Sequence, residues 1–196
     1  MAAEKSVRLP KHARGLPPRV VPVTPETADG EQKELLAADT IGHLNVIRTK
    51  LRSPALYKSW KGLSGHVLRR NSLPPRDREL LILRIGWLNQ SQYEFTQHVR
   101  VAKGVGITDA EIERLKTGPN ASSWTALEAA LLRSADQLRF DGMIDDPTWA
   151  ELAVHYDEVQ LLDVIATVGQ YNLISWFLNT LRTPLEPGVT PHPMAE

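Results

Sequence analysis

The sequence predicts an all-α protein of about eight helices with no substantial sheet. Apolar residues recur at helical spacing through the middle of the chain, and long alternating runs are absent. Helix-start signals, mostly a threonine or aspartate followed three residues later by glutamate or glutamine, separate the apolar stretches. With 196 residues, the chain is long enough for one compact domain with its own core.

A proline pair, Pro74 and Pro75, precedes a strongly apolar stretch. Proline suits the first turn of a helix, and the acids Asp77 and Glu79 follow near its positive end. These signals predict a helix over residues 76–88, with Glu79 inside its apolar run.

Capping signals predict the helices that follow. Gly104 and Gly106 end the next helix, and Asp146 with Pro147 forms the N-cap and first turn of another over 148–156. Three further helices begin with a capping box: Thr108 with Glu111, Thr125 with Glu128, and Asp157 with Gln160.

The last predicted helix, over 159–181, is apolar around much of its circumference. A helix of this kind is buried on more than one side. One interpretation is a central core helix. The other, which we favour in so small a protein, is that a second subunit covers part of it, so we expect a homo-oligomer.

Proline-rich segments flank the helical region. Residues 1–31 are predicted to form an extended, basic arm, which is either a floppy tail or a segment that packs on a neighbouring subunit. Residues 32–182 form the predicted helical domain, and residues 183–196 an irregular tail.

Composition excludes several classes of function. Lys and Arg total 23, as do Asp and Glu, so the formal net charge is zero, and no nucleic-acid partner is expected. The chain has no cysteine, which excludes disulfides, thiolate zinc sites, iron–sulfur clusters and a cysteine nucleophile.

The N-terminus shows no apolar run behind its basic residues, so no signal peptide is expected. No stretch is expected to reach the roughly 18 apolar residues of a membrane span, and no membrane partner is expected. We therefore expect the protein in the cytoplasm.

The most informative polar residues lie between positions 79 and 98. Ser91, Glu94 and His98 share one face of the helix after the Glu79 helix, and Tyr93 flanks that face. A carboxylate one turn before an imidazole can accept its hydrogen bond and orient it for proton transfer. If Glu79 faces the same cavity, the site holds two acids and one histidine.

Two other interpretations stay open for these residues. A glutamate and a histidine four positions apart are also an ordinary surface pair. Carboxylates and imidazoles also bind metals, but two ligands are too few and no HExxH helper is present, so we predict no metal ligands here.

Three segments in this order, RDREL, YEFTQH and VGQY, resemble the carboxymuconolactone decarboxylase family, whose relatives include the alkylhydroperoxidase D-like proteins. The resemblance extends over roughly residues 40–182. It implies an alkylhydroperoxidase D-like helical bundle that assembles into trimers or hexamers.

The resemblance also implies site residues. Glu79 and His98 match the family's glutamate and histidine, while Ser91 and Glu94 stand where the peroxidase branch has its two cysteines. Without thiols, peroxidase chemistry is excluded at this site. The decarboxylase branch uses no metal or organic cofactor, and the chain looks closer to that branch.

We expect His98, Glu79, Glu94 and Tyr93 to be catalytic. A second group is expected to bind substrate: Trp87, Arg84, Tyr171, His66 and Ser91. Alternatives stay open for Trp87 as plain core and for Arg84 as the partner of an acid such as Glu79.

The favoured function is a cofactor-free carboxy-lyase, which decarboxylates a small lactone or carbonyl substrate or moves a proton on it. A second interpretation is a non-catalytic oligomeric scaffold with the same fold. A third is a metal-dependent hydrolase or oxygenase that uses Glu79, Glu94 and His98.

Overall fold

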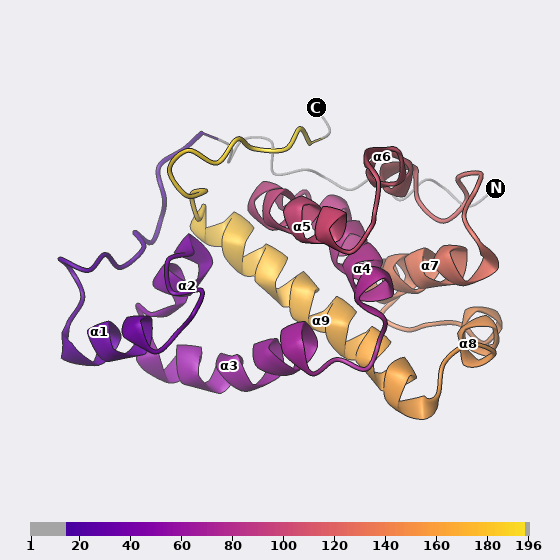
Figure 1. The fold of residues 1–196 in the computed structure, drawn as a ribbon, viewed down its shortest axis with the longest axis horizontal. Coiled ribbons are helices and arrows are strands. Elements are labelled where there is room, and N and C mark those ends of the chain that lie inside the picture. The colour runs from indigo at the N-terminus through magenta and orange to yellow at the C-terminus, as the bar shows by residue number, and fades with distance from the viewer. Residues whose placement is uncertain (1–14, 195–196) are drawn as a thin grey trace.

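The computed structural model describes residues 15–194, and within that range the chain forms nine helices and no strand. The helices, which Figure 1 labels in order, are α1 (Gly30–Ala37), α2 (Asn45–Lys50), α3 (Pro54–Arg69), α4 (Pro75–Leu88), α5 (Gln92–Gly104), α6 (Asp109–Thr117), α7 (Ala126–Phe140), α8 (Asp146–Ala153) and α9 (Glu158–Leu181). The all-α prediction is confirmed. The basic residues Lys5, Arg8, Lys11 and Arg14 of the predicted arm lie outside the described residues.

The predicted helix starts are largely confirmed. The capping boxes at Thr108, Thr125 and Asp157 are all formed, because each side chain accepts from the backbone three residues on. One cap was wrong: Asp145, rather than Asp146, accepts from Thr148 and begins α8. A further capping box, missed in the sequence, begins α1 at Asp29.

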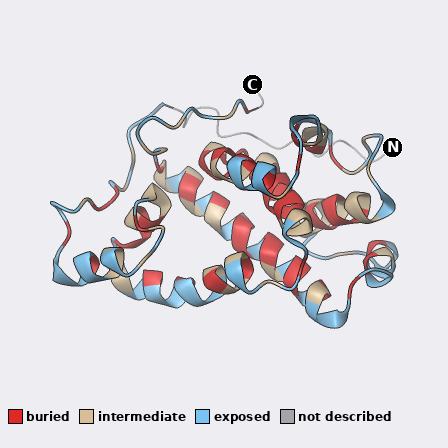
Figure 2. Ribbon diagram, in the orientation of Figure 1, coloured by how far each residue is buried: buried red, intermediate tan, exposed pale blue. Residues whose placement is uncertain are grey.

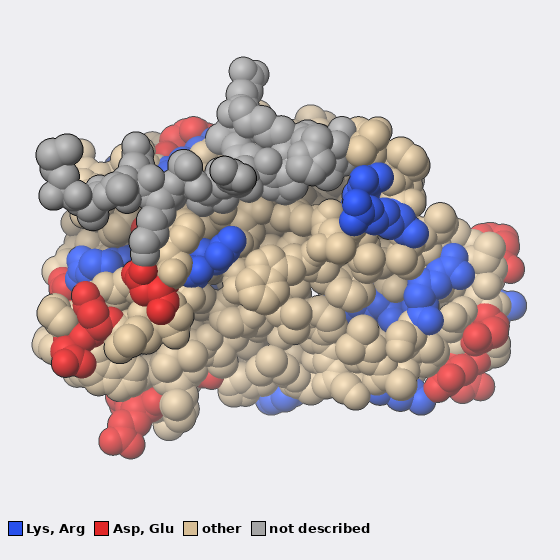
Figure 3. Space-filling view, turned by 180° about the vertical axis from the view of Figure 1, so that it is seen from behind, with Lys and Arg blue, Asp and Glu red and all other residues tan. Residues whose placement is uncertain are grey.

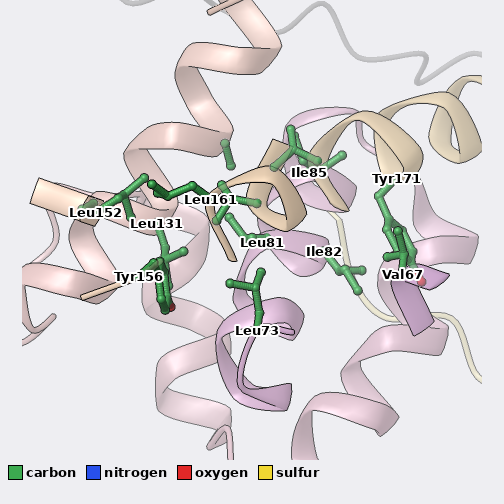
Figure 4. Close-up of a cluster of buried hydrophobic side chains, with 14 of the residues drawn as sticks. Val67, Leu73, Leu81, Ile82, Ile85, Leu131, Leu152, Tyr156, Leu161 and Tyr171 are labelled. Atoms are coloured by element: carbon green, nitrogen blue, oxygen red, sulfur yellow. The ribbon is translucent and has the colours of Figure 1, made fainter. Parts of the chain in front are cut away.

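Helix α4 is the centre of the fold, and it packs against α5, α6, α7 and α9. Nearly every residue from Glu79 to Leu88 is buried, and Figure 2 shows buried residues gathered along α4, α7 and α9. One face of α4 joins a core cluster with α7, α8 and α9, in which Leu81, Ile85 and Leu131 lie (Figure 4). The opposite side packs Leu80 and Leu83 against Phe95 and other residues of α5 and α6.

Helix α9 crosses the middle of the molecule (Figure 1) and is only partly covered. One stripe along it stays exposed and apolar: Val159, Leu162, Ile165, Leu173 and Trp176. By length and composition α9 could cross a membrane, which corrects the expectation that no stretch would, yet half of its apolar window is buried against the rest of the chain, as in a core helix.

The segment after α9 lies over α5. The carboxylate of Glu186 accepts the backbone N–H of Asn45 at 2.7 Å and also bonds the Tyr93 hydroxyl. Further on, the backbone N–H of His192 donates to Thr96 Oγ1 at 2.9 Å. The described part of the C-terminal segment therefore contains no helix but is attached to the bundle.

Candidate functional site

A buried carboxylate and an imidazole form the centre of the candidate site. Glu79 lies on α4 with no exposed surface, and its Oε2 is 2.7 Å from His98 Nδ1 on α5. Arg78 Nε lies 3.3 Å from the other oxygen of Glu79. The neighbouring guanidinium and imidazole therefore give each oxygen of the buried carboxylate a nitrogen partner.

This geometry leaves the second nitrogen of His98 available. Since Nδ1 donates to Glu79, Nε2 carries the lone pair in the neutral tautomer that this bond assigns. The His98 side chain is 13% exposed, so the pair reaches the surface through the histidine and not through the carboxylate. A carboxylate–imidazole pair of this kind can accept a proton at Nε2 and return it.

Tyr171, on α9, packs its ring edge-on against His98, with the ring centroids 4.8 Å apart and an interplanar angle of 87°. Burial raises the pKa of its hydroxyl well above the ordinary value, and the nearby carboxylates of Glu79 and Glu94 raise it further. The hydroxyl therefore stays protonated and can donate a hydrogen bond.

Glu94 does not pair with His98, which corrects the expectation drawn from their spacing. Its Oε2 accepts instead from Ser175 Oγ of α9 at 2.7 Å, and its Oε1 has no partner in the described part of the chain. Burial raises the pKa of this carboxyl well above its usual range. Ser91 is close in sequence and also fully buried, and its hydroxyl has no partner among the described residues.

Tyr93 points away from the Glu79–His98 pair. Its hydroxyl donates to Glu186 and accepts from the backbone N–H of Val46 at 3.1 Å. Both bonds tie α5 to the segments around α2 and after α9, so the expected catalytic donor has a structural role.

Arg84 is also engaged structurally. Its Nε and Nη2 donate to the two carboxylate oxygens of Asp136 at 2.6 and 2.8 Å. Its Nη1 donates to the carbonyls of Leu115 and Lys116, the last turn of α6. Arg84 is therefore the partner of an acid, as one of the two interpretations expected, but that acid is Asp136 and not Glu79. All three guanidinium nitrogens donate to protein groups, so none is left for a substrate carboxylate.

Two more expected substrate-binding residues contact other parts of the molecule. Trp87 packs against Phe95 in the core beside α5 and α6, and Lys116 Nζ lies 5.2 Å from its ring centroid. His66 bonds Asp163 of α9 through Nε2. Neither contacts Glu79 or His98, because α3 and the far face of α4 direct these side chains elsewhere.

Glu79 and Glu94 are buried, and the site reaches the surface at the His98 side chain. Three cavities that the described residues form are lined by other residues and not by Glu79, Glu94 or His98. In residues 15–194 no three His, Asp or Glu side chains are placed to hold a metal ion, so the metal-dependent alternative has no support.

Sequence reasoning missed Arg78 and Ser175 as partners of the two acids. Arg78 directly precedes Glu79, but adjacent helical residues do not normally face one another, so spacing gave no signal. Ser175 lies 81 residues from Glu94, and only the burial of α9 beside α5 brings them together.

Replacing Glu94 by glutamine should make the protein more stable at neutral and alkaline pH. A raised folded-state pKa means that the folded state holds a proton which the unfolded state loses above about pH 4.5. Stability from the protonated acid is thus fully present below that pH and declines as pH rises towards the folded pKa. An amide keeps the shape and avoids this decline.

Melting temperatures between pH 4 and pH 9 would measure the effect. We expect the melting temperature of the wild type to fall more steeply with pH than that of Glu94→Gln. The free energy of unfolding should differ by about 1.4 kcal/mol for each unit by which the pKa of Glu94 is raised. Glu113→Gln, which changes an exposed acid on α6, is the matched control and should follow the wild type. Parallel curves for wild type and Glu94→Gln would contradict an uncharged Glu94.

A model of the carboxymuconolactone decarboxylase family matches residues 54–137, the segment that carries Glu79, Glu94 and His98. Curated protein sequences give no significant match.

Solved structures share the fold at low sequence identity. An uncharacterized peroxidase-related protein from Ralstonia eutropha, described as an alkylhydroperoxidase AhpD core, has 14% identity and a TM-score of 0.73 over 89% of this chain and 98% of its own. A protein of unknown function from Agrobacterium tumefaciens has 20% identity and a TM-score of 0.64 over 70% of this chain and 94% of its own. The debrominase Bmp8 has 15% identity and a TM-score of 0.68 over 86% of this chain and 91% of its own. These similarities establish the AhpD-like fold.

Proposed function

We propose that the protein is a cofactor-free enzyme acting on a small lactone or carbonyl substrate, on the basis of the carboxymuconolactone decarboxylase family model that matches residues 54–137. The reaction is decarboxylation or a related proton transfer. The observation that carries the proposal is His98, held by the buried Glu79 through Nδ1 and packed against Tyr171, with Nε2 free to meet a substrate.

Decarboxylation needs a proton donor and a place for negative charge. As the bond from carbon to the carboxylate breaks, carbon dioxide leaves and the electron pair moves into an adjacent unsaturated carbonyl, which gives an enolate. His98, protonated on both nitrogens, then donates the Nε2 proton to carbon. The enolate oxygen accepts a hydrogen bond from a neutral donor, and Tyr171, whose ring packs on His98, offers its hydroxyl for this role.

The two acids have different environments and so different roles. Glu79 has a nitrogen partner on each oxygen, Arg78 Nε and His98 Nδ1, and it fixes the orientation of the imidazole. Glu94 has only a hydroxyl partner and a raised pKa, so it serves as a neutral acid. Environments that separate two carboxyl groups in this way are typical of acid–base sites.

Thiol chemistry is not part of the proposal. One structural neighbour is named a debrominase and another peroxidase-related, but this chain has no cysteine. A step through a sulfenate or a disulfide therefore has no residue to perform it.

A scaffold without catalytic activity is the second candidate, and the closed packing of the site favours it. Glu79 and Glu94 are at most 2% exposed, and the best-formed cavities lie elsewhere. A substrate can reach His98 only from the side where the imidazole is exposed, or after neighbouring segments move.

Release of carbon dioxide from a panel of lactones and keto acids that carry a carboxylate next to an unsaturated carbonyl tests the proposal. We expect turnover of at least one compound, unchanged after dialysis against a chelator. Binding of such compounds without any turnover would favour the scaffold and contradict the enzyme.

We further propose that the protein is a homo-oligomer, a trimer or hexamer, in the cytoplasm. The support is the exposed apolar stripe of α9, in which Leu162 is 65% and Trp176 50% exposed. Figure 3 shows that the face seen from behind carries few charged side chains across its middle. Burying such a stripe between subunits is favourable by about 25 cal/mol for each Å².

Light scattering would test the assembly. We expect a mass several times the 21.9 kDa of one chain, and a monomer for the double variant Leu173→Glu, Trp176→Glu. Val154→Glu, which charges an exposed apolar residue at the end of α8 outside the stripe, should leave the mass unchanged. A wild-type monomer at micromolar concentration would refute the proposal.

A further inference from the structure

We propose that the cavity between α2 and α3 is a second binding site, which takes the carboxylate group of a small organic acid on Lys50. The cavity is separate from the Glu79–His98 site and shares no residue with it. The proposal therefore does not depend on the proposed enzymatic function.

Lys50 is the unusual residue of this cavity. It is the last residue of α2 and is only 5% exposed. Within the described residues its ammonium has neither a hydrogen-bond acceptor nor a carboxylate within 4.0 Å. Its closest favourable contact is the face of Trp60, whose ring centroid lies 4.4 Å from Nζ. An ammonium that is mostly removed from water, with three donors and an aromatic face against it, lacks an anion that accepts its hydrogen bonds.

The charges around the cavity also favour an anion. Lys61 and Arg69 line it together with Lys50, and the only acid in its lining is Asp39. That acid already accepts from the Tyr57 hydroxyl and pairs with Lys61 at 3.6 Å. Three cations therefore face one carboxylate that has other partners, and one further negative charge is favoured.

The size and walls of the cavity indicate which anion fits. Its volume is about 30 Å³, which is room for roughly two water-sized groups. The two oxygens of one carboxylate fill this space. Ile41, Ile47 and Leu68 form apolar walls that suit the hydrocarbon part of an organic acid. Ser64, also in the lining, offers a hydroxyl whose oxygen already accepts from Gln170, which leaves its proton free to donate.

The titration of Lys50 agrees with this geometry. Burial lowers the pKa of the ammonium to about 8, and Asp39 opposes the shift only in part. A bound carboxylate would favour the charged form and raise that pKa again. Binding must then weaken as the pH rises above 8, because the free protein loses the proton that the complex needs. Asp39 and Tyr57, which also line the cavity, do not titrate in that range: the pKa of Asp39 is lowered, and that of Tyr57 is raised by burial and by Asp39.

Titration of the full chain with sodium acetate, inorganic phosphate and sodium chloride at constant ionic strength tests the site. The side-chain resonances of ¹³C-labelled lysine report binding. Lys50→Met assigns the Lys50 signal and removes its charge, and it shortens the side chain by only one atom. We expect acetate to shift the Lys50 signal and Lys50→Met to bind acetate roughly 10- to 100-fold more weakly, as expected for the loss of a charged hydrogen bond. The matched control is Lys58→Met, which changes an exposed lysine of α3 outside the cavity and should bind as the wild type does.

A second measurement needs only the wild-type protein. Acetate stays ionised between pH 7 and pH 10, so its affinity should fall up to about tenfold for each pH unit above 8. Equal binding by wild type and Lys50→Met, or an affinity that does not change with pH, would overturn the proposal. Equal effects of acetate, phosphate and chloride would overturn the assignment to a carboxylate.

Discussion

Replacing His98 by glutamine is expected to lower turnover about a hundredfold or more, with a melting temperature close to that of the wild type. The glutamine amide can still donate to Glu79, so the buried carboxylate keeps a partner. It cannot carry a proton between a substrate and solvent. Turnover of a substrate found in the carbon dioxide assay and thermal unfolding, measured on the same preparation, give both quantities.

The outcome separates a catalytic role from a structural one. His43→Gln is the matched control, since His43 is exposed in the loop before α2, and it should change neither quantity. Full turnover in a folded His98→Gln protein would reject His98 as the proton carrier. A large fall in melting temperature with turnover retained would assign His98 to the packing of α4, α5 and α9.

The sequence predicted most of the helices because their signals are local. A capping box places its two members three residues apart, and those at Thr108, Thr125 and Asp157 begin helices as expected. At α8 the N-cap is Asp145 and not the predicted Asp146, so the signal is accurate to one residue where two aspartates precede a proline. Both can cap and both leave the proline in the first turn, so the proline does not decide between them; in the structure it is Asp145 that accepts from Thr148.

The contacts of the site depend on which helices become neighbours, and spacing does not encode this. Helical periodicity placed Glu94 and His98 on one face of α5, but α4 supplies the partner of His98 and α9 the partner of Glu94. The contact between Glu79 and His98 was expected from the family resemblance and not from periodicity. Tyr171 was expected to bind substrate because its hydroxyl could reach the cavity from the last helix, and its ring does pack on His98.

Long-range partners explain the residues that were misassigned. Tyr93 bonds a carboxylate 93 residues away, and Arg84 bonds one 52 residues away. A polar side chain in an apolar helix must have some partner, and the sequence alone cannot distinguish a ligand from a distant acid. The need for a partner therefore gave a correct expectation at Glu79. Tyr93 was expected at the site because it flanks the face of Glu94 and His98, but its hydroxyl bonds Glu186 instead.

Arg84→Leu is expected to lower the free energy of unfolding by about 3 kcal/mol, the cost of removing one partner from a buried ion pair. The Arg84 side chain is 7% exposed and that of Asp136 24%, so the abandoned carboxylate is only partly able to recruit water. The carbonyls of Leu115 and Lys116 at the end of α6 lose their donor as well. Chemical denaturation followed by circular dichroism measures the loss.

A matched control removes an arginine–carboxylate pair that water already screens. Arg133 of α7 pairs with Glu151 of α8, and both side chains are about a third exposed. Arg133→Leu should therefore lower the free energy of unfolding by about 1 kcal/mol or less. The folded fraction of Arg84→Leu should turn over substrate with an unchanged KM, because the guanidinium donates only to groups of the protein itself. The opposite result, a raised KM with stability unchanged, would mean that Arg84 leaves Asp136 to bind a substrate carboxylate. The ion pair would then be the resting state of a binding residue instead of a fixed contact between α4 and α7.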